Sequence, residues 1–372
     1  MIKFINLKNK IENFFSLFSW EIGVDLGSSN TLIYLKDRGV IIDEPTMIAR
    51  RKKKRWTGLS APKVKNSGPI AFGFKAKEML NREPRQIEVV SPIKNGIISD
   101  LEALETLISY YLKLVYEIPS KYPKIFKPKV IVGVPSSINQ VQKRAIKSVF
   151  LNSGAKEVLL LEEVVLAAIG IGLPVDSCSG LVVVDVGGGK TEVSVVSMGG
   201  VVVGRGIKTA GNDLDNSIIN YLKMKYGMLV GPNSAERIKM EIGNFSNKKN
   251  DDKKTALIKG RDLETGLPKI IKLTEDEIKE AITMELTKIV KLVSTVLDET
   301  PPELMEDVLK RGIVLVGNGG RINGLAQLIE SETKIFTKVL EDPGMMVIKG
   351  CGELIQNKEL LKQVKLVSGI KE

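Results

Sequence analysis

Histidine is absent from this chain of 372 residues, and its cysteines number two, Cys178 and Cys351. Without histidine the chain cannot use Ser-His-Asp or Cys-His catalysis, and it cannot bind zinc through histidine. Two thiolates are also too few for a structural zinc site, which needs four ligands. So little cysteine is typical of a protein that works in a reducing cytoplasm.

Long apolar runs are missing too. No stretch of about 18 apolar residues appears, so no helix is expected to span a membrane. Aromatic residues make up 5% of the chain, which argues against a surface that stacks sugars or bases. The hydrophobic share of 43% and charged share of 27% are typical of a globular protein, and the length allows two domains with full cores.

Acidic residues are outnumbered by basic ones, which gives a net charge of +11 and predicts a polyanionic partner. The densest basic cluster lies at residues 50–55. We interpret it as a solvated loop rather than a nucleic-acid site, because neither a helix-turn-helix nor a zinc-finger pattern accompanies it. No specific nucleic-acid partner is expected.

The first 20 residues contain apolar side chains at helical spacing, with lysines between them. The apolar residues are Phe4, Leu7, Ile11, Phe14, Phe15 and Phe18. The pattern predicts an amphipathic helix with a basic polar face. Such a helix either packs on its own domain or lies in a membrane surface. We favour the membrane, because so much aromatic surface sits near a terminus.

Strand-like and helical segments alternate along the rest of the chain. The clearest buried strands are expected at residues 130–134, 158–161, 181–186 and 313–316, and the clearest helices at residues 101–116, 139–153, 213–226 and 274–297. This alternation predicts an α/β fold with mixed sheets. A strand that ends in aspartate, then a glycine turn and a second strand, occurs at Asp25 and again at Asp185, which suggests two related halves.

Both of these turns have the composition of a phosphate-binding loop. Residues 25–31 read DLGSSNT, and residues 185–192 read DVGGGKTE. Glycines and small hydroxyl residues expose backbone N–H groups, which can cradle phosphate oxygens. The aspartate fits better as a holder of hydrated Mg²⁺, because it would repel a phosphate. An ordinary β-hairpin explains the first turn equally well, whereas a plain hairpin rarely uses three successive glycines.

A third glycine cluster, GNGG at residues 317–320, follows the last predicted buried strand. A glycine-rich turn between a strand and a helix can pack against a base or a ribose. Glu236 and Lys239 lie three residues apart on a predicted helix and share one face, where a surface ion pair is the alternative. The joint occurrence of these motifs is more specific than any one of them.

Together these motifs resemble the actin, Hsp70 and sugar-kinase superfamily, and more narrowly the MreB family of bacterial actin homologues. The resemblance covers most of the chain in order. It is carried by IGVDLGSSNTLIYLKDRGVIIDEPT, VIVGVPSSIN, LEEVVLAAIGIGLPV, VVVDVGGGKTEVSVVSMGG, TAGNDLDNSIINYLKMKYG, SAERIKMEIGN and RGIVLVGNGG.

The resemblance implies an actin-like fold of two domains, each a mixed β-sheet with flanking helices and a smaller subdomain. Domain I would span residues 21–176 (small subdomain 49–102), domain II residues 177–345 (small subdomain 214–277), and residues 346–372 would return to domain I, with residues 1–20 as the membrane-binding helix.

The resemblance also implies that the two domains close around ATP and Mg²⁺. Asp25 and Asp185 would hold the Mg²⁺ ion, and Glu163 would position the attacking water. Lys190 is the second candidate catalytic residue. The residues expected to contact the nucleotide are Gly27, Ser28, Ser29, Asn30, Gly187, Gly188, Gly189, Lys190, Gly211, Glu236, Lys239, Gly317, Asn318 and Gly319.

Members of this family stack head to tail into protofilaments, which pair on the inner face of the plasma membrane and organise cell-wall synthesis to set rod shape. Their partners include membrane proteins of the elongation machinery, and they reach the lipid through an N-terminal helix, a hydrophobic loop or both. Here both candidates exist: the predicted helix, and Ile125 and Phe126 within the basic segment 121–129. Two weak anchors repeated along a polymer give avidity.

Three departures from the family pattern bear on activity. Lys190 stands where threonine is usual, Val164 and Val165 replace proline and methionine, and Asn318 interrupts the third glycine cluster. Lys190 either neutralises phosphate charge or displaces the attacking water, and a side chain turned to solvent is the alternative. We hypothesise that hydrolysis is slower than in typical members while ATP binding is retained.

Three other functions compete with the filament interpretation. An Hsp70-like chaperone would need a substrate-binding domain, for which about 20 residues after Gly352 leave little room. A sugar or acetate kinase would leave the membrane features unexplained. A divergent paralogue that binds ATP, hydrolyses it slowly and does not polymerise fits the departures.

Overall fold

The computed structural model describes residues 20–52, 68–120, 122–245 and 254–369. They form two compact units. The first contains described residues within Met1–Val134, Ile138–Leu166 and Ile348–Lys362, and the second those within Pro135–Ser137, Ala167–Val347 and Gln363–Glu372. The predicted N-terminal helix, residues 53–55 of the basic cluster and residues 246–253 lie outside the described parts of the chain.

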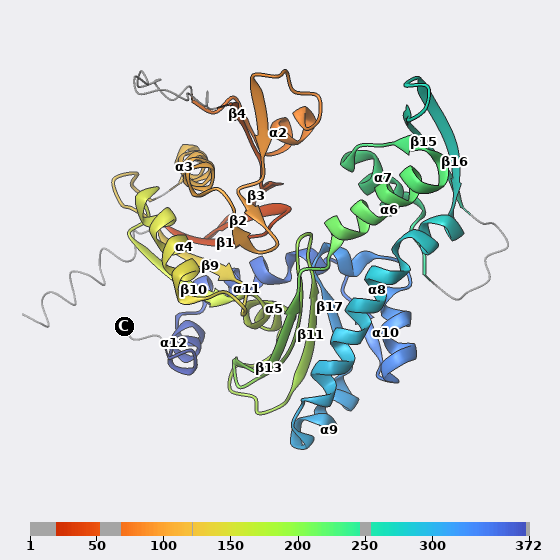
Figure 1. The fold of residues 1–372 in the computed structure, drawn as a ribbon. Helices are drawn as coiled ribbons and strands as arrows, with labels where there is room; N and C mark the ends of the chain where they lie inside the picture. Colours follow the sequence, from red (N-terminus) through yellow and green to blue (C-terminus); the bar gives the residue numbers. More distant parts are fainter. Residues whose placement is uncertain (1–19, 53–67, 121, 246–253, 370–372) are drawn as a thin grey trace, which may run out of the picture. The chain divides into compact units, whose positions relative to one another are not determined.

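The first unit is built on a five-stranded mixed sheet with the order β10-β9-β1-β2-β3 (Figure 1). The strands are β1 (Glu21–Leu26), β2 (Asn30–Leu35), β3 (Gly39–Pro45), β9 (Lys129–Val134) and β10 (Glu157–Glu162). β1 and β10 each pair in parallel with β9, whereas β1, β2 and β3 are antiparallel. The continuous apolar run of β9 is explained by its central place in the sheet, where both of its faces are covered.

Helices and two small sheets complete this unit. The helices are α2 (Gly73–Met79), α3 (Leu101–Glu117) and α4 (Gln140–Asn152), and the small strands are β4 (Ile48–Arg51), β5 (Ala71–Phe72), β6 (Ile87–Val90), β7 (Ile93–Lys94) and β8 (Ile97–Ile98). α5 (Glu163–Ile171) begins in this unit, and its residues from Ala167 on belong to the second. α3 begins where the Asp100 carboxylate accepts the backbone N–H of Ala103 at 3.0 Å. Its Leu104, Leu107 and Tyr111 side chains are buried in the core of the unit. α11 (Met346–Gln356) and α12 (Lys358–Val367) follow near the end of the chain.

The second unit repeats the same sheet plan, with the order β13-β12-β11-β17-β18. Its strands are β11 (Leu181–Val186), β12 (Thr191–Ser197), β13 (Gly200–Ile207), β17 (Ile313–Val316) and β18 (Thr337–Val339). The pairs from β11 to β13 are antiparallel, and β11, β17 and β18 are parallel. The repeat at Asp25 and Asp185 is therefore also a repeat of topology, because each aspartate lies on the strand that joins the parallel and antiparallel halves of its sheet.

A three-stranded sheet and several helices surround this second sheet. The strands are β14 (Met228–Leu229), β15 (Thr255–Asp262) and β16 (Pro268–Thr274), and the helices are α6 (Gly211–Tyr226), α7 (Pro232–Ile242), α8 (Glu275–Asp298), α9 (Pro302–Arg311) and α10 (Leu325–Thr333), with 3-10 turns at Asn318–Arg321 and Pro343–Met345. Figure 1 shows α6 and α7 beside the long β15–β16 hairpin. Among the described residues, no helix has both the length and the apolar character needed to cross a bilayer.

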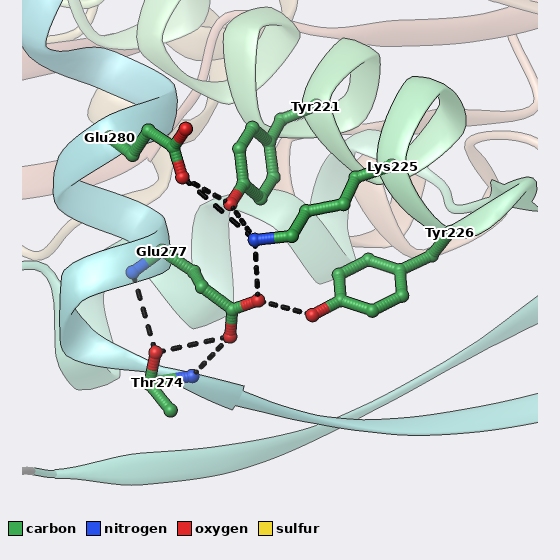
Figure 2. A network of polar contacts seen from close by, with 6 residues as sticks. All are labelled: Tyr221, Lys225, Tyr226, Thr274, Glu277 and Glu280. Carbon is green, nitrogen blue, oxygen red and sulfur yellow. Dashed lines mark hydrogen bonds and ion pairs between the residues drawn. The ribbon is translucent and has the colours of Figure 1, made fainter.

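A polar network joins the end of α6 to the start of α8 (Figure 2). The Glu277 carboxylate accepts hydrogen bonds from the Tyr226 hydroxyl and from the backbone and side chain of Thr274, and it lies 3.1 Å from Lys225 Nζ. The Thr274 bonds form a capping box at the start of α8. Partial burial acts to raise the pKa of Glu277, but these donors outweigh it and lower the pKa to about 2.

The same lysine extends the network along α6. Lys225 Nζ donates to the Tyr221 hydroxyl at 2.6 Å, and that hydroxyl donates to Glu280 at 2.6 Å. Hydrogen bonds to Tyr221 and Glu277 raise the pKa of Lys225. The network therefore links side chains in the last two turns of α6 to the first two turns of α8.

We expect Glu277→Gln to lower the free energy of unfolding by about 1–2 kcal/mol at pH 7, because it weakens the cap and removes the charge that faces Lys225. The folded-state pKa of Glu277 lies below its ordinary value of 4.5. Its contribution is therefore complete above that value and is lost as the pH falls toward 2. Denaturant unfolding should show the wild type and the variant converging over that range.

Glu306→Gln is the matched control. Glu306 pairs with Lys310 one turn away on α9, and both side chains are largely exposed. Its loss should cost under about 0.5 kcal/mol. An equal effect of the two substitutions at neutral pH would contradict the importance assigned to Glu277.

Candidate functional site

The two aspartate turns close in the same way. In the first unit, the Gly27 N–H donates to the Asn30 carbonyl at 3.0 Å, and in the second, the Gly187 N–H donates to the Lys190 carbonyl at 3.0 Å. In each case the aspartate belongs to the strand before the turn, and the next strand begins at its far end. Each unit thus carries one short loop of small residues at the end of its central strand, as the sequence predicts.

The turn of the first unit is supported by its neighbours. The Thr46 hydroxyl donates to the Gly27 carbonyl at 2.7 Å, and the Ser28 hydroxyl accepts the Gly96 N–H at 2.8 Å. The Thr46 N–H also donates to the carbonyl of Ser29 at 2.8 Å. Because Ser28 is used as an acceptor, its own O–H can still donate to a ligand oxygen. Asn30 is held by a 2.9 Å hydrogen bond to Asp43.

A buried thiol connects two further predicted residues of this unit. Cys351 on α11 is fully buried, and burial together with the charges of Asp25 and Glu163 raises the pKa of its thiol. Both carboxylates therefore lie within electrostatic range of one sulfur atom. A Cβ built on Gly23 would lie 2.5 Å from the Cβ of Cys351, so glycine is needed where α11 crosses β1. Neither Cys351 nor Gly23 was predicted as a site residue, since neither belongs to a turn.

In the second unit, the glycine turn is fixed to the beginning of α6. The Gly211 N–H donates to the Gly187 carbonyl at 3.1 Å, and the Asn212 N–H donates to the Gly188 carbonyl at 2.8 Å. Amides in the first turn of a helix have no partner inside the helix, so this contact satisfies two of them. Gly211, expected at the site from the resemblance, is therefore in contact with the turn at residues 187–189.

Lys239 extends this contact to α7. Its ammonium donates to the Gly211 carbonyl at 2.9 Å and lies 2.8 Å from Asp215 Oδ1, and both side chains are nearly buried. In this structure Lys239 thus anchors α7 to the start of α6. Glu236 lies one turn earlier on α7 and is half-buried. Asp215 was not predicted, although a carboxylate among the apolar positions of α6 was a signal for a buried partner.

The third glycine cluster lies against the end of β11. Gly317 has φ +75, and a Cβ there would lie 2.4 Å from Asp185 Oδ1 and 2.4 Å from the Val186 carbonyl. A Cβ on Gly319 would approach the Val186 side chain to 2.5 Å. The structure thus brings together three predicted residues, and only glycine at position 317 lets the backbone approach the Asp185 carboxylate so closely.

The nearly buried Asp185 fits a place in a magnesium site. Within the described ranges, no three histidine, cysteine, aspartate or glutamate side chains are grouped so that they could hold a metal ion alone. Mg²⁺ in nucleotide sites keeps several waters and needs one or two carboxylates besides the phosphates. The chemistry of the Asp185 carboxylate thus suits such an ion, with waters and phosphate oxygens as the remaining ligands.

Lys190 forms an ion pair with Glu192. The lysine side chain is 15% exposed and the glutamate 2%. Lys190 is thus turned toward a buried carboxylate on β12 rather than toward bulk water. Glu192 was not predicted as a site residue.

Family comparisons identify the relatives of this chain. The model of the MreB/Mbl protein family matches residues 19–363. The cell shape-determining protein MreB of Escherichia coli K12 is 39% identical over 346 residues, which are 93% of this chain and 96% of that protein. Mbl of Bacillus subtilis is 36% identical over 353 residues, 94% of this chain and all of that protein.

The chain belongs to the MreB/Mbl family.

Solved structures agree with this MreB/Mbl assignment. The crystal structure of MreB5 of Spiroplasma citri bound to ADP has a TM-score of 0.83 and 30% identity, covering 94% of this chain and 98% of that one. The MamK double helical filament has a TM-score of 0.73 at 20% identity, over 91% of this chain and 99% of that one, and shows a shared fold. The predicted actin-like fold is therefore confirmed.

One departure from the MreB/Mbl pattern has a structural explanation. Asn318 interrupts the third glycine cluster, and a Cβ on Gly344 would lie 2.3 Å from its Oδ1 atom. The missing side chain at Gly344 thus makes room for the added amide. Val164 and Val165, the second departure, are both buried in α5.

The predicted membrane loop of this MreB/Mbl chain presents one apolar side chain. Ile125 is 83% exposed and lies between the exposed Lys124 and Lys127. Phe126, in contrast, is half-buried. The loop is anchored by Trp20, whose Nε1 donates to the Pro123 carbonyl at 3.2 Å.

The basic cluster at residues 50–55 includes one structural arginine. Arg50 lies 2.7 Å from Glu88 and 2.6 Å from Asp100. Its charge is therefore compensated by two carboxylates inside the first unit.

We expect Gly317→Ala to lower the free energy of unfolding by about 2–4 kcal/mol, because it combines an unfavourable φ with a clash against Asp185 and Val186. Gly266→Ala is the matched control: Gly266 has φ +72 with open space around its Cβ, so only about 1–2 kcal/mol of backbone strain is expected. Denaturant unfolding measures both. Equal losses would show that the close approach at Gly317 is unimportant.

Proposed function

We propose that this chain binds ATP with Mg²⁺ and polymerises into filaments on the cytoplasmic face of the membrane, where it helps to set cell shape. The observation that carries this proposal is the duplicated turn: in both units an aspartate is the last but one residue of the central strand, and a closed loop follows that strand. The relatives support it, since solved structures of MreB5 contain ADP or AMPPNP.

Each unit supplies its own contacts to the nucleotide in this proposal. In the first, the turn at residues 27–30 offers backbone amides and the Ser28 hydroxyl to phosphate oxygens, and Asp25 faces the metal. In the second unit, the turn at residues 187–190 offers its backbone amides to phosphate oxygens, and Asp185 faces the metal. The residues proposed to contact the nucleoside are Gly319, Glu236 and Lys239. The bound Mg²⁺ would neutralise phosphate charge.

Glu163 is proposed to orient the attacking water. Its carboxylate is 5% exposed and lies in the first turn of α5. At such a position it can accept a hydrogen bond from water and hold the oxygen toward the terminal phosphate, which is the positioning that phosphoryl transfer requires.

Assembly is proposed to be head to tail, because a heterologous contact that does not close generates an open filament. The MamK relative is described as a double helical filament, which supports polymer formation by this fold. Membrane proteins of the cell-wall elongation machinery are the proposed partners, since the relatives are cell shape-determining proteins.

Membrane contact is proposed to involve the predicted helix at residues 4–18 and the loop at Ile125. An exposed isoleucine between two lysines suits an anionic leaflet, where each basic residue near the surface contributes about 1 kcal/mol. Burial of the isoleucine side chain adds about 1.5–3 kcal/mol.

Pelleting of the purified chain with anionic liposomes, followed by electron microscopy, tests the proposal. With ATP and Mg²⁺ we expect filaments bound to lipid, and without nucleotide fewer or none. Ile125→Ser should reduce lipid binding of unpolymerised protein by roughly tenfold, since one buried apolar side chain is lost. Leu309→Ser, a change at a 65% exposed position on α9, is the control and should have no effect.

Monomers under every nucleotide condition would contradict the filament proposal. They would favour the second candidate function, a paralogue that binds ATP and does not polymerise. The Lys190–Glu192 ion pair favours that candidate more than any other observation, because it places a charged pair where the family has a hydroxyl.

Slow hydrolysis is the activity proposed for either candidate. A lysine that is engaged with Glu192 cannot position water as a hydroxyl does. We expect Lys190→Thr to raise the single-turnover rate of ATP hydrolysis roughly tenfold, the scale of one hydrogen bond in the transition state. An unchanged rate, measured with nucleotide in excess over its dissociation constant, would show that Lys190 does not limit the reaction.

A further inference from the structure

Three charged side chains gather where β11 ends and β12 begins. Asp185 on β11 is the direct cross-strand partner of Glu192 on β12, so both carboxylates are on the same face of the sheet. Lys190, just before β12, contacts Glu192 through its ammonium. The group therefore contains the carboxylate proposed for the metal, a second carboxylate and one cation.

Burial makes the balance of these charges important. Glu192 is 2% exposed and Asp185 is 9% exposed. Like charges placed opposite each other on neighbouring strands are unfavourable, and a buried carboxylate without a partner costs several kcal/mol. Within the described part of the chain, the Oε1 atom of Glu192 accepts no hydrogen bond, so the ion pair with Lys190 is its principal stabilising contact.

The sheet also makes room for Glu192. Gly206 is its cross-strand neighbour on β13, and a Cβ there would lie 3.3 Å from the Cγ atom of Glu192. The glutamate side chain thus occupies space that a larger neighbour would restrict. This fixes the carboxylate at the base of the glycine turn, within reach of the residue that follows the three glycines.

We propose that Glu192 is a positioning residue of the nucleotide site. It holds the ammonium of Lys190 and cancels its charge, so that the pair sets how strongly the second turn attracts the terminal phosphate of the nucleotide. This inference rests on the proposed ATP binding. It differs from that proposal because the residue concerned does not contact the nucleotide and acts through Lys190.

The direction in which each single substitution changes the affinity for the nucleotide follows from the charge that it leaves. Glu192→Gln removes one negative charge from beside the turn, so binding of a triphosphate analogue should tighten. Lys190→Met leaves a buried anion, so binding should weaken. The double variant has no net change in charge and should return close to the wild type.

The effect should be larger for a triphosphate than for a diphosphate, because the terminal phosphate brings further negative charge to the turn. For one unit charge in a partly buried site, we expect roughly tenfold changes in the dissociation constant of AMPPNP. ADP should change several-fold less. The ratio of the two constants is therefore the decisive quantity, since a purely structural role would affect both nucleotides alike.

The experiment is a double-mutant cycle on the full chain by isothermal titration calorimetry, with AMPPNP and then ADP, both with Mg²⁺. Protein concentrations are kept below those at which the wild type sediments. Thermal melts and the fitted stoichiometry report the folded fraction of each variant, since Lys190→Met is expected to destabilise the fold. A melt restored by adding Glu192→Gln shows that the loss came from the unpaired carboxylate.

The Lys269–Asp262 pair provides a matched control cycle. It is a lysine–aspartate pair at 2.7 Å in the same unit, on the β15–β16 hairpin. Lys269→Met, Asp262→Asn and their combination should leave the ratio of AMPPNP to ADP affinity unchanged.

Two results would overturn the inference. The first is an AMPPNP to ADP ratio that stays within about twofold in all variants, which is less than the effect of one nearby charge. The second is weakening by both single substitutions with no recovery in the double variant. If the wild type itself bound neither nucleotide, the proposed function would fail together with the inference.

Discussion

The contact between the glycine turn at residues 187–189 and the first turn of α6 organises the whole second unit. Two carbonyls of the turn are held by the Gly211 and Asn212 amides. This contact is possible only where backbone approaches backbone without side chains between them. The neighbouring elements depend on it in turn, because Lys239 joins α7 to Gly211 and the third glycine cluster closes on the other side of the same strand.

The turn of the first unit is held in place by different contacts. This turn has one glycine and two serines, and it is held by the hydroxyls of Thr46 and Ser28 rather than by helix amides. Behind the strand, α11 packs so closely that Gly23 faces Cys351 directly. The duplicated topology is thus preserved while the packing around each turn differs.

Sequence patterns predicted the elements whose residues are buried on all sides. The strands at 181–186 and 313–316 coincide with β11 and β17, because continuous β-branched runs occur where both faces of a sheet are covered. The short strands β4 to β6 and the hairpin β15–β16 were not anticipated. Apolar residues occupy exposed positions in the hairpin, such as Leu257 on β15 and Ile270 on β16, and this hides the alternation that identifies a strand.

The predicted site residues came from turns, and those that were missed came from ion pairs and packing. Glu192 and Asp215 are buried acids, and the sequence does not show which lysine each of them pairs with. Lys190 was predicted as a site residue, but only the structure shows which carboxylate it contacts. Lys190 and Asn318 both differ from the family, and each has an evident neighbour, Glu192 in one case and Gly344 in the other.

The two thiols of this chain differ greatly in accessibility. Cys351 is fully buried, and burial keeps it protonated, whereas Cys178 lies exposed on the second unit. A maleimide dye reacts with accessible thiolates, so it should label Cys178 and spare Cys351. The sequence therefore offers one position for a fluorophore, and a labelled protein can be prepared without adding or removing a cysteine.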